Sequence, residues 1–235
     1  MKPAEGGKPV NLVIYRSIPL AGLLLLAAPA YAHDPALDAP LPSLIEYLPL
    51  GIEHVLIGYD HLAFVLGLLL LARTRRALFA AITGFTLAHS LSLSACVLGI
   101  LTPPSSWVEA AIALSIAYVA IAHRTSTSSA QAVIVSLAFG FIHGFGFAGA
   151  LEELGLPLQD TALALVLFNV GVEAGQLLAL SAFIPALAVL RRYTHGLLIL
   201  RYSLFALGLA LTASRGLLIV SEAQSESARL VDVGP

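Results

Sequence analysis

The stretch Glu53-His54-Val55-Leu56-Ile57-Gly58-Tyr59-Asp60-His61 stands at the start of an apolar run that continues to Ala72. One charge at the centre of a membrane span costs about 2.5 to 3.5 kcal/mol, so a chain keeps such residues where they find partners, water or a metal. His54 and His61 are seven residues apart, as are Glu53 and Asp60. On an α-helix a step of seven returns to within about 20° of the same face. The spacing therefore predicts one helix over 51–72 with a face of metal ligands.

Composition places the chain in the membrane class. Its 235 residues are 58% hydrophobic and 11% charged, and its mean hydropathy is +0.91, whereas soluble domains carry about 25% charged residues. The single cysteine, Cys96, excludes a disulfide within one chain and a thiolate cluster, so a metal site must use histidine and oxygen ligands. The net charge of -2 argues against a nucleic-acid partner. The sequence also lacks a Gly-x-x-x-x-Gly-Lys-Ser/Thr run, which argues against nucleotide binding.

Residues 1–32 have the pattern of a secretory signal peptide. A basic leader precedes an apolar core over 18–29, and Ala30-Tyr31-Ala32 forms an A-x-A cleavage site. The alternative is a retained first membrane helix, which the short core and its prolines disfavour. Cleavage would make His33 the mature N-terminus, where its amino group and imidazole could bind a metal such as nickel or copper. In the alternative interpretation His33 only marks where the signal ends.

The mature chain is predicted to be an all-α bundle of six transmembrane helices. A proline-rich periplasmic lead-in over 33–50 precedes the transmembrane domain at 51–220, and 221–235 form a polar C-terminal tail. The expected spans are 51–72, 77–101, 107–122, 132–151, 161–190 and 197–220. The outer connections, 102–106 and 152–160, hold no basic residue, so the positive-inside rule places the mature N-terminus outside. The inner connections then hold Arg73, Arg75, Arg76, Arg124, Arg191 and Arg192, with Arg201 close by.

Polar side chains inside the later spans complete the candidate site. His89, His143 and Glu173 are expected at mid or outer depth on three different helices. A lone intramembrane histidine is often a packing residue, but several ionisable residues at compatible depth are functional by default. His123 and His195 lie at inner helix ends instead. We therefore predict one polar cavity with the metal ligands His54, Asp60, His61, His89, His143 and Glu173, supported by Glu53, Ser90, Asn169 and Gln176.

Four motifs on four spans resemble the HupE/UreJ family of bacterial membrane proteins. They are Gly51–Leu62, Phe85–Ser90, Phe139–Phe147 and Phe168–Gln176, and the resemblance covers roughly 51–190. It implies a nickel or cobalt permease of the bacterial inner membrane, made with a cleaved signal sequence and linked to hydrogenase or urease maturation. The family's first motif corresponds to His54, Gly58, Asp60 and His61. Val55 stands where the better-known branch has proline, so the chain is closer to the second branch.

Three functions follow from these residues. The first is a permease that takes a divalent nickel, cobalt or zinc ion from the periplasm, with Asp60 or Glu173 exchanging protons. The second is an intramembrane zinc hydrolase in which histidines hold the metal and a carboxylate activates its water. The third is a metal sensor or accessory subunit. The oligomeric state stays open, a homo-oligomer included.

Overall fold

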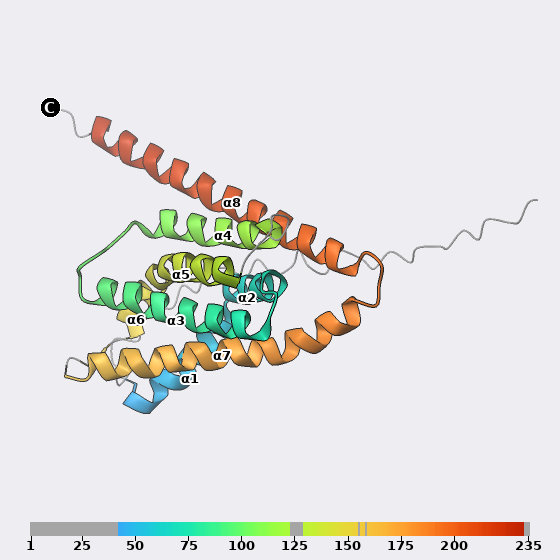
Figure 1. Cartoon of the computed structure of the whole chain (residues 1–235). Helices are drawn as coiled ribbons and strands as arrows, with labels where there is room; N and C mark the ends of the chain where they lie inside the picture. The colour runs from blue at the N-terminus through green and yellow to red at the C-terminus, as the bar shows by residue number, and fades with distance from the viewer. Residues whose placement is uncertain (1–41, 123–128, 155, 158, 233–235) are drawn as a thin grey trace, which may run out of the picture. The chain divides into compact units, whose positions relative to one another are not determined.

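The computed structural model describes residues 42–122, 129–154, 156–157 and 159–232, and every regular element in these ranges is a helix (Figure 1). The predicted signal peptide, His33, and His123 with Arg124 lie outside the described residues. A short 3-10 helix at Leu44–Glu46 precedes the first α-helix. The α-helices are α1 Tyr47–Ile57, α2 Tyr59–Leu71, α3 Arg75–Val97, α4 Ser105–Ile121, α5 Ser129–Phe145, α6 Ala148–Leu154, α7 Thr161–Leu190 and α8 Gly196–Asp232.

The predicted first span is broken, so the expectation of one straight helix over 51–72 is wrong. α1 and α2 meet at Gly58 and are bent by 74° relative to each other. Gly58 has an extended ψ of 98°, and a Cβ at this position would lie 2.7 Å from the carbonyl oxygen of His54 and 2.8 Å from Nδ1 of His61. Only a residue without a side chain fits there. α1 also begins earlier than predicted, because Pro49 lies in its first turn, where proline is tolerated.

The helices are arranged in pairs. α3 packs closely against α5, α4 against α8, and α1 against α7, while α2 contacts α1, α3, α4, α5, α7 and α8. Glycines allow the closest approaches: a Cβ on Gly140 would lie 2.9 Å from the Cα of Phe85, and one on Gly171 would lie 3.0 Å from the Cα of Gly51. The first half of the bent segment, α1, therefore belongs to the α1/α7 pair, whereas α2 contacts both this pair and the α3/α5 pair.

Fewer than the predicted six helices are long enough to count as candidate membrane spans. Among the described residues, three helices are long and apolar enough to cross a membrane, namely α3, α7 and Gly196–Ser221 of α8, and the bent pair α1 and α2 makes a fourth. α4 and α5 are shorter apolar helices. Large apolar side chains such as Leu91 of α3 and Leu217 of α8 are exposed, as expected for surfaces that face lipid.

Two further boundaries differ from the prediction. The expected helix over 132–151 ends at Phe145 and resumes as the separate α6, so His143 lies in the last turn of α5 and not in the middle of a span. The last helix continues through most of the expected polar tail to Asp232. α7 matches the predicted 161–190 and continues through Pro185.

Candidate metal site

Four histidines from four helices gather around the break between α1 and α2. His54 comes from the last turn of α1, His61 from the first turn of α2, His89 from α3 and His143 from α5. The ring centroid of His61 lies 4.4 Å from that of His54, 6.3 Å from that of His89 and 5.3 Å from that of His143. His61 is therefore the central member of the group, which we call the histidine cluster.

Three members of the cluster are close enough to share one ion. Each of His54, His61 and His89 offers a ligand atom, and these atoms all lie within 4.8 Å of one another. On a straight helix His54 and His61 would be separated by about 10.5 Å along the axis, at about 1.5 Å per residue. The break at Gly58 brings the two rings together, so the site depends on the bend.

The Nε2 atoms of the histidine cluster have no protein partner. Those of His54, His61, His89 and His143 are all buried and make no hydrogen bond with any described residue. Leaving one buried polar group unpaired costs about 1 to 3 kcal/mol, and native proteins contain few such groups. Four together indicate a site whose partner is a ligand, and imidazole nitrogen suits zinc, copper, iron and nickel.

Hydrogen bonds on the other ring nitrogen fix two of these imidazoles. The Asn169 side chain donates from Nδ2 to the carbonyl oxygen of Leu165 at 2.8 Å, so its Oδ1 faces Nδ1 of His89 at 3.2 Å. An amide oxygen only accepts, so the proton of neutral His89 is on Nδ1 and the lone pair is on Nε2. The carbonyl oxygen of Phe139 lies 2.8 Å from Nδ1 of His143 and has the same effect. Metal-binding histidines are commonly oriented in this way.

Phenylalanine rings surround the histidine cluster. The centroid of Phe147 lies 3.9 Å from that of His54, Phe85 stacks on His89 at 6.0 Å, and Phe64 lies 5.1 Å from His143. His89 is 0% exposed and His143 is 1% exposed. These walls exclude water, which strengthens electrostatic interactions within the site.

The predicted carboxylates have other partners. Asp60 Oδ2 accepts from the Arg215 guanidinium at 2.6 Å, and both side chains are half-buried. Arg215 also donates to the backbone carbonyl oxygen of Glu109 at 2.8 Å, which joins α8 to α2 and α4. Glu53 is exposed. The structure thus groups the histidines and places the Asp60 carboxylate in an ion pair, so its role as a ligand stays a prediction.

Sequence reasoning overlooked Arg215. Its signal was present, because it is a basic residue near the end of the last apolar run (197–220), and an intramembrane ionisable residue predicts a partner of opposite charge. The partner itself depends on the packing of α8 against α4, which spacing alone does not reveal.

Glu173 and the supporting amides lie where α3 meets α7. Thr83 donates to Glu173 Oε1 at 2.7 Å, and Thr86 donates to Gln176 Oε1 at 3.1 Å, while the Nε2 of Gln176 is buried without a partner among the described residues. Together with the contact between His89 and Asn169, these pairs form what we call the polar seam. Glu173 is therefore part of the seam and accepts a hydrogen bond from Thr83, and its role as a metal ligand stays a prediction.

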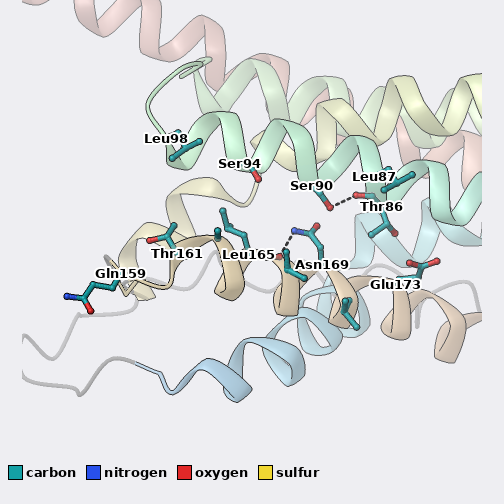
Figure 2. Close-up of a pocket in the computed structure, with 13 residues that line it drawn as sticks. Thr86, Leu87, Ser90, Ser94, Leu98, Gln159, Thr161, Leu165, Asn169 and Glu173 are labelled. Carbon is teal, nitrogen blue, oxygen red and sulfur yellow. Dashed lines mark hydrogen bonds between the residues drawn. The ribbon is translucent and has the colours of Figure 1, made fainter.

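A groove opens next to the polar seam, between α3 and α7 (Figure 2). Its volume is about 740 Å³, and its walls carry both apolar and hydroxyl side chains. Ser90, predicted as a supporting residue, lies on its α3 wall and donates to the carbonyl oxygen of Thr86 at 2.7 Å. Asn169 lines the groove as well, so one side chain contacts both the groove and the histidine cluster.

Comparison with known proteins identifies the family. A family model described as HupE / UreJ protein matches residues 33–220, which include every residue of the histidine cluster. No curated protein and no solved structure matches the chain. Because the matched range covers far more than half of the sequence, the chain belongs to the HupE/UreJ family.

Proposed function

We propose that the chain is a permease for a divalent first-row transition metal, and that the histidine cluster is its binding site within the membrane. The observation that carries the proposal is the group of four buried Nε2 atoms that have no hydrogen-bond partner among the described residues. Three of these histidines can share one ion. The cargo would be held by neutral imidazoles at a place where helices from separately packed pairs meet.

The type of ligand limits which metal ions the permease would carry. Imidazole ligands favour nickel, cobalt, copper and zinc, whereas magnesium and calcium favour shells of oxygen atoms. The family resemblance makes nickel and cobalt the first candidates, with zinc as the third, and supply of hydrogenase or urease as the physiological role. Asp60 and Glu173 remain candidates for balancing the charge of the cargo, since a dication among neutral ligands in a dry site needs nearby negative charge.

The zinc hydrolase is the weaker alternative. It requires a carboxylate free to act as base toward a metal-bound water. The two candidate bases are engaged elsewhere, Asp60 with Arg215 and Glu173 with Thr83. A resident, slowly exchanging zinc ion would favour the hydrolase.

The proposed setting is the bacterial inner membrane, with a cleaved signal peptide, a periplasmic mature N-terminus and six spans. In this arrangement α4 and α5, each of 17 residues, are short spans of about 25 Å at about 1.5 Å per residue. This is somewhat less than the roughly 30 Å hydrocarbon core. The bent pair of α1 and α2 is the first span.

Flux into proteoliposomes tests the proposal. Full-length protein should admit nickel, cobalt or zinc to a trapped metal-sensitive dye, and His89→Ala should abolish most of the flux. His195→Ala is the matched control and should transport normally, because His195 is exposed and lies outside the cluster. Stoichiometric zinc that never exchanges, combined with no flux of any of the three metals, would overturn the permease.

A further inference from the structure

We propose that the groove between α3 and α7 is the vestibule through which the hydrated cation reaches the histidine cluster, a proposal that rests on the permease function. The groove extends from Leu98 and Thr161, where α3 ends and α7 begins, to Glu173 and the polar seam (Figure 2). Its volume of about 740 Å³ exceeds the space of a six-water shell, which is on the order of 200 Å³ at about 30 Å³ per water.

The hydroxyl groups along the groove present oxygen lone pairs. Thr86, Ser90 and Ser94 follow one another at intervals of four on α3 and all line the groove. Ser90 donates its proton to a backbone carbonyl at 2.7 Å, and Thr161 does the same to Pro157 at 2.7 Å. A hydroxyl that has donated its proton keeps acceptor lone pairs, which can hold the waters of a cation shell.

One side chain connects the groove with the histidine cluster, and a second adds a carboxylate to the groove wall. Asn169 lines the groove while its Oδ1 contacts Nδ1 of the buried His89. Glu173, one turn further along α7, adds a carboxylate to the groove wall. From the open end inward the groove thus presents hydroxyls, then the amide of Asn169 and the carboxylate of Glu173, and the imidazole of His89 lies beyond the amide. Only this last step exchanges oxygen ligands for a nitrogen ligand, which suits nickel, copper and zinc.

The two helix pairs can separate along the polar seam. α3 packs tightly with α5, and α7 with α1, so the groove lies between two separate helix pairs. Its inner end is closed by the side-chain pairs of the polar seam. Hydrogen bonds that water can replace have a small net free energy, about 0.5 to 1.5 kcal/mol each. Separating the pairs at the seam would join the vestibule to the histidine cluster.

Thiol labelling tests the vestibule. In a Cys96→Ala background of the full chain in sealed membrane vesicles, Ser90→Cys and Ser94→Cys should react with a charged, membrane-impermeant thiol reagent. The matched control is Leu91→Cys, between them on α3 but 64% exposed and outside the groove. Because only the thiolate reacts, a thiol in hydrocarbon is inert. We expect the groove cysteines to react at least about tenfold faster than the control, and nickel, cobalt or zinc to slow them severalfold.

Two results would overturn the vestibule. Groove cysteines as slow as Leu91→Cys would mean that no water-filled groove exists. Fast labelling unaffected by any of the three metals would mean that the groove does not carry the cation. Metal flux measured on the same variants keeps these failures separate from failure of the permease, because continued flux would mean that the cation reaches the histidine cluster by another route.

A blocking variant gives the second readout. Ser94→Trp should fill the groove and lower metal flux by about tenfold or more while the equilibrium affinity in detergent stays within about twofold. Leu91→Trp, on the neighbouring lipid-facing position, should change neither. Normal flux in a folded Ser94→Trp protein would also overturn the vestibule, whereas equal loss of affinity and flux would assign Ser94 to the metal site itself.

Discussion

Asn169→Leu removes the hydrogen bond that orients His89 without touching a metal ligand. In the native chain the amide oxygen Oδ1 of Asn169 lies 3.2 Å from Nδ1 of His89. It holds the imidazole proton on Nδ1 and leaves Nε2 free for the metal. Leucine is nearly isosteric with asparagine but cannot accept a hydrogen bond. The imidazole would then lose its preferred tautomer and orientation, and its Nδ1–H would be buried without a partner.

The loss of folding stability and the loss of metal affinity are separate effects. The unsatisfied buried donor costs about 1 to 3 kcal/mol of stability. Removing the partner of a metal-binding histidine typically lowers metal affinity about 10- to 100-fold, which corresponds to about 1.4 to 2.8 kcal/mol. We therefore expect Asn169→Leu to weaken nickel, cobalt or zinc binding by about 10- to 100-fold, measured by isothermal titration of the purified protein in detergent.

Two further variants make the result specific. Gln176→Leu is the matched control, because it changes another amide of the polar seam. This amide accepts from Thr86 at 3.1 Å and makes no hydrogen bond to a histidine among the described residues, so the metal affinity should stay within about twofold. Asn169→Asp keeps an acceptor for Nδ1 and should restore most of the affinity. Unchanged affinity in a folded Asn169→Leu protein, or an equal loss in Gln176→Leu, would refute the orientation argument.

Three other outcomes are expected. His61→Ala and His143→Ala should each remove most of the metal affinity. The double variant should lose much less binding free energy than the sum of the two single losses, because the effects of ligands of one centre are not additive. His195→Ala should bind normally, and strictly additive losses would indicate two sites. Arg215→Met should lower the free energy of unfolding by about 2 to 3 kcal/mol, because it leaves the half-buried carboxylate of Asp60 unpaired. Adding Asp60→Asn to the same chain should recover part of this loss, as measured by thermal unfolding. Competition binding should rank nickel, cobalt and zinc above magnesium and calcium, and tight magnesium binding that survives loss of the histidines would contradict the ligand assignment.

Much of the helical framework follows from hydropathy alone. The apolar runs at 77–101, 107–122 and 161–190 correspond closely to α3, α4 and α7, since a long uninterrupted apolar stretch predicts helix in a membrane. The break at Gly58 could not be predicted in the same way. A single glycine within an apolar run is tolerated in many helices, and here the closeness of His54 and His61 accompanies the bend.

The grouping of the histidines could be anticipated from the sequence, whereas the partners of the carboxylates could not. Spacing and depth singled out His54, His61, His89 and His143, because imidazoles within spans are rare and noticeable. The directions of Asp60 and Glu173 depend on how α8 and α3 pack beside them, which determines that Arg215 and Thr83 are within reach. Helix periodicity gives the face of a residue on its own helix, whereas its partner depends on tertiary packing.

X-ray absorption spectroscopy of the purified full-length protein loaded with one equivalent of nickel, cobalt or zinc tests the histidine cluster most directly. A metal held by this cluster should show at least three imidazole nitrogen ligands, at about 2.0 to 2.1 Å in the case of zinc, and the imidazole signal should fall in His89→Ala. A shell made only of oxygen atoms, with no imidazole scattering and no change in His89→Ala, would contradict the account.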